Sequence, residues 1–255
     1  MIHTGLVSVT FRKLKPRAIA DLVAKGGLDA IEWGGDVHVP HGDLATARVV
    51  RAMTEKAGLA IPSYGSYYRV GHREPVAFEV VVNTALALGA PIIRVWAGKQ
   101  GSDTADEAYW RAVIDDSVHC ADLAAAAGLR IAYEYHGNTL TDTDEAALRL
   151  LETVDHPAVT TYWQLRGQAA EADDVAGLTG ILPWLTHIHI QGSRRTETGS
   201  ERAPLSATSG AWSRRLSVAA TAPGDHVAML EFVVGDSPSQ FLADAQVLSS
   251  MVSAL

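Results

Sequence analysis

Short apolar runs rich in β-branched residues alternate with longer stretches of helical periodicity along the 255 residues. The runs expected to be strands are residues 4–10, 30–33, 60–64, 92–97, 130–136, 159–164, 186–191 and 227–233. The expected helices lie near residues 16–26, 43–57, 75–88, 105–127, 142–153, 170–181, 210–219 and 238–252. Such alternation is typical of parallel strands joined by crossover helices.

Eight strand and helix repeats predict an α/β protein, a (β/α)8 TIM barrel that forms one domain over residues 1–255. Glycines follow several expected helices, at Gly26, Gly58, Gly89 and Gly128, where glycine can adopt the left-handed conformation that ends a helix. The stretch 192–210 after the seventh strand is rich in Ser, Thr and Arg. We expect it to be an irregular loop that serves as a lid.

Polar side chains gather at the carboxyl ends of the expected strands. The set comprises Glu32, Arg94, Trp96, Glu134, His136, Gln164, His189, Gln191 and Glu231. Residues two apart on a strand point the same way, so Glu134 should share a face with His136, and His187 with His189. Because this end of a TIM barrel carries the active site, the pattern predicts a functional pocket there.

Four of these residues form a plausible ligand set for a divalent metal ion: Glu134, Gln164, His189 and Glu231. Carboxylate and amide oxygens with one imidazole suit Mn²⁺, Mg²⁺, Co²⁺ or Zn²⁺. The same residues permit a second interpretation, a polar site without metal. In that case two buried glutamates would pair with Arg94 and Arg195.

Further side chains are candidates for contacts with a substrate. They are Glu32, Trp33, His38, Tyr64, Arg94, Trp96, His136 and Arg195. His38 falls in the loop after the second strand, and such loops line the mouth of a barrel. The aromatic residues can offer stacking faces to a sugar ring, or they can be ordinary packing. His136 can act as an acid or base, or hold a hydroxyl group.

Composition narrows the range of partners. A formal net charge of −8 argues against nucleic acid, because phosphate backbones are bound by clustered Lys and Arg. The chain has no basic leader followed by an apolar stretch and no apolar run of about 18 residues, so we expect a cytoplasmic protein without membrane contact. With Cys120 alone, an intrachain disulfide is impossible. The oligomeric state is left open, with a homodimer as one option.

The order of these motifs resembles the sugar phosphate isomerase and epimerase family with the xylose-isomerase-like TIM barrel. The resemblance covers the whole chain and rests on Glu32 within residues 31–34, Glu134 within 133–138, His189 within 187–189 and Glu231 within 230–232. It implies a metal-dependent isomerase or epimerase that acts on a sugar, keto sugar or sugar phosphate through a cis-enediolate. In this interpretation Glu134 and Glu231 exchange the substrate proton.

The ketose 3-epimerases of that family hold their metal with Glu, Asp, His and Glu. Glu134, His189 and Glu231 match three of these ligands, whereas Gln164 stands where the family has Asp. A neutral amide in place of a carboxylate predicts weaker metal binding. Arg195 matches the family's substrate-binding arginine, six residues after the metal histidine.

Two further functions stay open at the level of sequence. A dehydratase or lyase on a cyclitol or keto sugar begins with the same removal of a proton next to a carbonyl, but then expels a hydroxyl group. A sugar-binding protein with a degenerate metal site would retain the pocket without turnover, because of Gln164.

Overall fold

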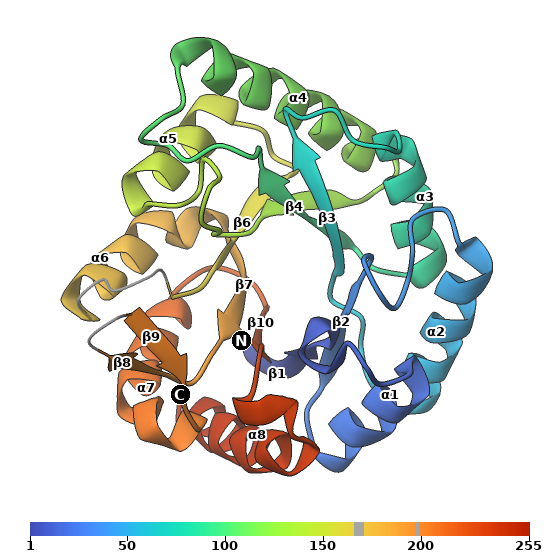
Figure 1. Ribbon diagram of the computed structural model, residues 1–255, viewed down its shortest axis with the longest axis vertical. Coiled ribbons are helices and arrows are strands. Elements are labelled where there is room, and N and C mark those ends of the chain that lie inside the picture. The colour runs from blue at the N-terminus through green and yellow to red at the C-terminus, as the bar shows by residue number, and fades with distance from the viewer. Residues whose placement is uncertain (166–170, 197–198) are drawn as a thin grey trace.

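Eight of the strands close into a parallel barrel, as Figure 1 shows down its axis. The computed structural model describes residues 1–165, 171–196 and 199–255, except for the side chains of residues 171–173 and 195. The barrel strands follow the order β1, β10, β7, β6, β5, β4, β3, β2, and β2 pairs with β1. Their bounds are β1 Ile2–Val7, β2 Ala30–Gly34, β3 Tyr64–Val70, β4 Ile92–Ala97, β5 Arg130–Tyr133, β6 Val159–Trp163, β7 Leu185–Ile190 and β10 His226–Leu230. The predicted fold class is therefore confirmed.

The α-helices form the outer ring, one after each barrel strand (Figure 1). They are α1 Pro16–Lys25, α2 Leu44–Lys56, α3 Phe78–Leu88, α4 Glu107–Ala126, α5 Asp144–Val154, α6 Glu171–Ile181, α7 Ser209–Ala219 and α8 Pro238–Ser253. Their ends follow local chemistry: Asp43, Asp106, Thr143 and Ser237 each accept a hydrogen bond from a backbone N–H in the first turn. At the other end of α3, Gly89 has φ +78°, which glycine adopts without steric cost.

One predicted strand is misplaced. The run 60–64 contributes only an isolated bridge between Ala60 and Ala30, and β3 begins at Tyr64 and continues to Val70. Pro62 has no N–H to donate to a neighbouring strand. β3 also shifts its register against β4 between Gly65 and Tyr68, where Tyr67 has φ +58°. An irregular strand of this kind has no clean alternation of apolar and polar residues.

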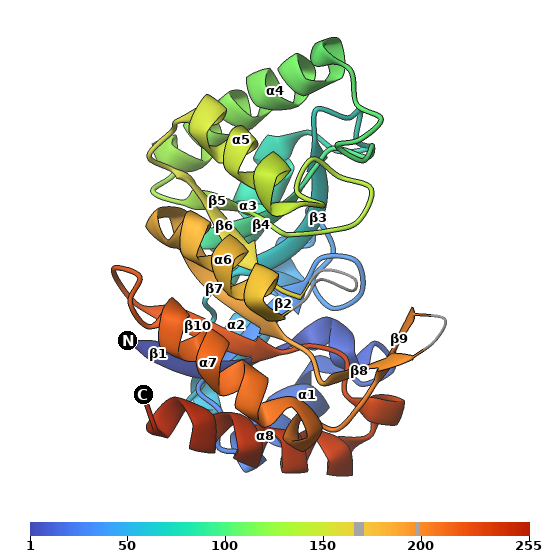
Figure 2. The same cartoon turned by 90° about the vertical axis from the view of Figure 1, so that its left-hand side faces the viewer.

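The stretch 192–210 contains more structure than the sequence predicts. Strands β8, Ser193–Thr196, and β9, Gly199–Arg202, form an antiparallel hairpin, and a short helix η3, Leu205–Thr208, leads into α7. The hairpin projects from one end of the barrel, and both chain ends lie at the other (Figure 2). Because β1 starts at the amino-terminal side, the hairpin stands at the carboxyl end of the strands.

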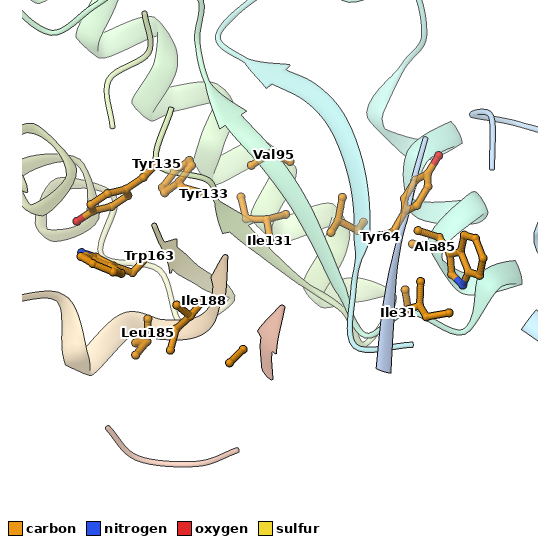
Figure 3. Close-up of a cluster of buried hydrophobic side chains, with 14 of the residues drawn as sticks. Ile31, Tyr64, Ala85, Val95, Ile131, Tyr133, Tyr135, Trp163, Leu185 and Ile188 are labelled. Atoms are coloured by element: carbon orange, nitrogen blue, oxygen red, sulfur yellow. The ribbon is translucent and has the colours of Figure 1, made fainter. Parts of the chain in front are cut away.

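The inner and outer faces of the strands build two separate apolar clusters. The inner cluster includes Ala30, Ile92, Ala132, Tyr162 and Met229. The outer cluster fills the space between strands and helices, and Figure 3 shows part of it. Each of those five inner residues comes two positions before a predicted site residue: Glu32, Arg94, Glu134, Gln164 and Glu231 respectively. The strand period of two therefore directs these polar side chains into the barrel.

Candidate active site

A buried ion network crosses one half of the barrel interior. Arg94 donates through Nε to Glu32 at 2.8 Å and through Nη1 to the carboxylate of Glu134. All three side chains are nearly inaccessible to solvent, with exposed fractions of 1%, 0% and 3% for Arg94, Glu32 and Glu134. Buried charges are tolerated only when they are paired and hydrogen-bonded, so this triad is held together by its own electrostatics.

Glu32 is fully buried within this network, and both of its carboxylate oxygens already accept hydrogen bonds from the protein. Ser63 and Tyr162 each donate a hydroxyl hydrogen bond to its Oε2 at 2.8 Å, while Oε1 accepts from Arg94. Burial alone would raise the pKa of Glu32, but the charge of Arg94 and the hydrogen-bond donors around the carboxylate outweigh it. The pKa of Glu32 is therefore held far below its usual range, and the residue stays ionised.

Gly65 of β3 makes room for this network. A Cβ at this position would lie 2.6 Å from Nη2 of Arg94 and 2.8 Å from Oε1 of Glu32. Neither neighbour can move away, because each is fixed by the ion pair. Any larger residue at position 65 would push Arg94 off the two carboxylates.

Oxygen atoms surround Nδ1 of His189 in the other half of the barrel. Gln164 Oε1 lies 3.0 Å away, Glu134 Oε1 3.5 Å and Glu231 Oε2 3.7 Å. Ligand atoms of Glu134, His189 and Glu231 all lie within 4.8 Å of one another. The structure thus brings together all four residues that the sequence predicts as metal ligands.

This arrangement fits a divalent cation. Nε2 of His189 is buried without a hydrogen-bond partner among the described residues, and it faces Oε1 of Glu32 at 3.8 Å. A carboxylate next to Nε2 favours the tautomer with the hydrogen on that nitrogen, which leaves the lone pair of Nδ1 free to bind a metal. With His189 neutral, the buried carboxylates of Glu32, Glu134 and Glu231 face the single positive charge of Arg94, which leaves a net charge of −2. A divalent ion would neutralise this charge.

A cavity of about 250 Å³ opens above the cluster, and Glu134, Gln164 and Glu231 form part of its lining. Trp96 and His136 also line it, with their rings 4.1 Å apart between centroids. Trp96 donates its indole N–H to the Glu134 carboxylate, which gives Glu134 a second fixed partner besides Arg94. His136 and Glu134 therefore share the cavity, as the strand alternation predicts.

His136 has a defined tautomer. Its Nδ1 lies 2.8 Å from the carbonyl oxygen of Gly137. Because a carbonyl oxygen only accepts hydrogen bonds, Nδ1 carries the hydrogen, and Nε2 of the neutral ring keeps its lone pair. Burial lowers the pKa of His136.

Four lining residues are not among the predicted catalytic, metal-binding or substrate-binding residues, although Gln191 belongs to the polar set at the strand ends. Gln191 donates its amide to Glu231 at 2.6 Å, and Arg12, Tyr67 and Phe232 complete the wall. Gln191 carried a signal, because it follows His189 by two positions at a strand end. Arg12 carried none, since it lies beyond the predicted first strand. Tyr67 offered only an aromatic ring that could stack on a sugar, because it lies beyond the predicted bounds of the third strand.

Three residues predicted to contact substrate lie elsewhere, so those assignments need correction. Trp33 and Tyr64 are fully buried on the outer face of the strands, where Trp33 donates to Thr54 and Tyr64 to the carbonyl of Val39. Figure 3 draws Tyr64 among the side chains of the outer apolar cluster. Both are packing residues, because each lies one position from an inward-facing residue of its strand and therefore points outward.

His38 is also structural. Its Nε2 faces the carbonyl of Leu14 at 3.3 Å and therefore carries the hydrogen, while Nδ1 accepts from Ser8 Oγ at 3.0 Å. Ser8 Oγ in turn accepts the N–H of Gly34 at 2.9 Å. His38 thus ties the loop after β2 to the segment after β1. The side chain of Arg195 lies outside the described part of the chain, so its predicted contact stays a prediction.

Within the described ranges, no helix combines the length and apolar character needed to cross a lipid bilayer.

Comparisons with known proteins agree with this architecture. The model of the xylose isomerase-like TIM barrel family matches residues 20–233. A 3-dehydroshikimate dehydratase from Bacillus anthracis is 31% identical over 100 residues, which are 39% of this chain and 36% of that protein. The matched stretch thus spans little more than a third of that relative.

Solved structures share the fold at low sequence identity. The probable 3-DHS dehydratase involved in petrobactin synthesis from Bacillus anthracis has a TM-score of 0.80 at 19% identity, covering 97% of this chain and 98% of that one. A xylose isomerase-like TIM barrel protein from Mycobacterium smegmatis, in complex with magnesium, has a TM-score of 0.73 at 18% identity, with coverage of 99% and 97%. D-psicose 3-epimerase from Clostridium cellulolyticum H10, with D-tagatose, has a TM-score of 0.71 at 14% identity, with coverage of 98% of both chains.

Proposed function

The chain belongs to the xylose isomerase-like TIM barrel family, and we propose that it is a metal-dependent dehydratase that removes water from a small cyclic keto acid or keto sugar. The observation that carries this proposal is the asymmetry of the candidate site. One glutamate, Glu134, is fixed by Arg94 and Trp96, while His136 lines the cavity beside it with a free Nε2. Beside the fixed Glu134, His136 is therefore the group available to accept a proton.

His136 is the proposed base. Its Nδ1–H is engaged by the Gly137 carbonyl, so Nε2 is the atom that takes a proton from the substrate carbon next to the carbonyl group. The ring is held against Trp96, which fixes its orientation above the cluster. A base that is already oriented needs no reorganisation when the proton moves.

A divalent ion held by Glu134, Gln164, His189 and Glu231 would act as a Lewis acid and stabilise the negative charge that develops on the substrate's carbonyl oxygen. Arg94 holds the carboxylate of Glu134 in place. Gln191 holds the carboxylate of Glu231 through a neutral hydrogen bond.

In the proposed elimination, His136 is the only group that needs to carry a proton. His136 removes the proton, the electron pair left behind forms the new carbon–carbon double bond, and the bond to the hydroxyl group on the next carbon breaks. Protonated His136 then returns its proton to the departing hydroxide, which leaves as water. The net change is the loss of one water molecule, and His136 ends neutral.

Two observations favour elimination over epimerisation. Epimerisation needs a second acid or base that returns the proton from the opposite face, and Glu134 is poorly suited because Arg94 and Trp96 occupy its carboxylate. Sequence similarity to a 3-dehydroshikimate dehydratase supports the same direction, at 31% identity over 100 residues.

A sugar isomerase or epimerase is the second candidate. Glu231 favours it, because among the described residues its carboxylate accepts a hydrogen bond from the neutral amide of Gln191, and it lies 3.7 Å from Nδ1 of His189. Glu231 with His136 would then form the pair of acid and base. The fold similarity to D-psicose 3-epimerase is compatible with this chemistry.

The test uses 3-dehydroshikimate with the full-length chain and added Mn²⁺ or Mg²⁺. We expect a product lighter by one water in mass spectrometry, with new ultraviolet absorption from an aromatic ring. His136→Gln should lower the rate by about a hundredfold or more, whereas His119→Gln, on the exposed face of α4, should leave it unchanged. Exchange of ketose protons with deuterated solvent, without loss of water from any keto acid, would instead establish the isomerase.

A further inference from the structure

A second cavity lies beside the candidate active site. Its volume is about 460 Å³, against 250 Å³ for the first, and Arg12 and Phe232 line both. The other lining residues come from the segment after β1 and from the loop after β10, with Arg202 from the hairpin. The first cavity alone is smaller than typical small-molecule sites of roughly 300–1,000 Å³, and the two together fall within that range.

The second cavity is rich in positive charge. Arg12, Lys13 and Arg202 line it, against the single carboxylate of Asp236, in a chain whose net charge is −8. Arg12 pairs with Asp36 at 2.5 Å and Arg202 with Asp236 at 2.7 Å, both at exposed positions. Lys13 has no acidic partner among the described residues. Lys13, which has no acidic partner in that part of the chain, lies beside Arg12 and Arg202, whose ion pairs are exposed to solvent. This arrangement of positive charge attracts an anion.

The position of this cavity matches a general property of TIM barrels. Arg202 belongs to the excursion after β7, the seventh barrel strand, and Asp236 belongs to the short helix η4, Val234–Asp236, after the eighth. Loops after these two strands, with a short extra helix, frequently form the phosphate-binding site of TIM-barrel enzymes. Charge and location therefore agree.

Phe232 is the wall between the two cavities. Its backbone takes φ +56°, a conformation uncommon outside glycine, and its N–H donates to Thr10 Oγ1 at 3.1 Å. The guanidinium of Arg202 lies 4.7 Å from the ring centroid. Phe232 follows Glu231 directly, so the residue beside the cluster and the residue beside the cations are chain neighbours.

We propose that the second cavity is an anion subsite of the active site, which binds a carboxylate or phosphate group of the substrate through Lys13, Arg12 and Arg202. The substrate's reacting carbon then lies in the first cavity, on the far side of Phe232. This assignment rests on the proposed function for the identity of the reacting part, but the anion site itself can be measured alone.

Calorimetric titration of the full chain with inorganic phosphate and with acetate tests the subsite at low salt. We expect saturable binding of at least one of these anions, about tenfold weaker in Lys13→Ala because a charge-assisted contact is lost. Lys15→Ala is the matched control, since Lys15 is exposed on the same segment and lines neither cavity. Asp236→Asn should tighten binding, because it frees Arg202 and removes a like charge, and asparagine tolerates the φ of +49° at this position.

Glu231→Gln separates this proposal from the proposed function. If anion binding survives in Glu231→Gln and weakens in Lys13→Ala, the subsite stands even where dehydratase activity is not found. If binding is unchanged in Lys13→Ala, the anion lies elsewhere and the subsite is overturned. Absence of saturable binding by both anions would overturn it as well.

Discussion

The two halves of the barrel interior hold their carboxylates in different ways. Under β2, β4 and β5, Glu32 and Glu134 share the guanidinium of Arg94, and every contact of the triad is buried. At the ends of β6, β7 and β10, the hydrogen-bond partners of Glu231 and His189 among the described residues are the neutral amides of Gln191 and Gln164. The first half has one cation for its two carboxylates, whereas the carboxylate of the second half forms no ion pair with Lys or Arg among the described residues.

This difference explains which residues are structural and which are available for chemistry. A carboxylate that shares a buried arginine is costly to move, so Glu32 and Glu134 form a fixed frame. Glu231 is buried, with an exposed fraction of 5%, and has no cation among the described residues. The divalent ion proposed above would supply a positive charge to this half.

The largest effect is expected from removing the cation of the first half. Arg94→Met leaves Glu32 and Glu134 buried without a counter-ion, and we expect a loss of about 3–5 kcal/mol in the free energy of unfolding. Urea denaturation measures it. Arg17→Met, which breaks an exposed pair with Asp21 within α1, should cost about 0.5 kcal/mol or less. Equal losses in the two variants would contradict a structural role for the triad.

A carboxylate added to the second half of the barrel interior should increase the affinity of that half for a divalent ion. Gln164→Asp adds a third negative ligand beside His189, and we expect Mn²⁺ to bind about tenfold to a hundredfold more tightly. Calorimetric titration measures the affinity. Gln246→Asp, on an exposed position of α8, adds the same charge far from the cluster and should leave the affinity unchanged. No gain from Gln164→Asp would mean that residue 164 is not a ligand.

A smaller effect should appear at His38, outside both halves. Burial lowers the pKa of His38 below its ordinary value of 6.5, so the folded state binds the proton less well than the unfolded chain does. Its stabilising contribution is fully present above pH 6.5 and is lost as the pH falls from that value through the lower pKa of the folded state. We expect His38→Gln to cost about 1 kcal/mol at pH 7.5 and clearly less at pH 5, in urea denaturation at both values. A constant difference would contradict the neutral tautomer.

The smallest effect on activity is expected at Tyr64. Its hydroxyl donates to the Val39 carbonyl at 2.7 Å, on the outer face of β3. Tyr64→Phe should lower the free energy of unfolding by about 1 kcal/mol and leave turnover unchanged. Tyr67→Phe, which alters a residue of the cavity wall, should instead raise KM. Reduced turnover in Tyr64→Phe would contradict a purely structural role and support the predicted contact of Tyr64 with substrate.

Much of the candidate site is readable from the sequence because a regular strand converts a period of two into a direction. Glu32, Arg94, Glu134, Gln164 and Glu231 each follow an inward-facing apolar residue by two positions, and all lie around the barrel interior as predicted. The prediction failed for Tyr64, where β3 starts later than expected and shifts register. Trp33 was misassigned because an aromatic residue next to Glu32 is on the opposite face.

The pairings inside the site could not be read in this way. Two arrangements of charge are compatible with the same strand ends, a metal site and a metal-free site of glutamates paired with arginine. The structure has features of both arrangements. Arg94 pairs with Glu32 and Glu134, as in the metal-free site, whereas Glu231 accepts a hydrogen bond from the neutral amide of Gln191. Which carboxylate receives the arginine depends on distances between strands, and these are tertiary information.

The most direct test is calorimetric titration of Mn²⁺ into the wild-type chain and into Glu231→Gln. Two uncompensated negative charges predict saturable binding of one ion per wild-type chain, and binding about a hundredfold weaker or absent in the variant, because the remaining charge is halved. Equal affinity in both proteins, or no saturable binding to the wild type, would contradict the account that the second half of the barrel is built around a divalent cation.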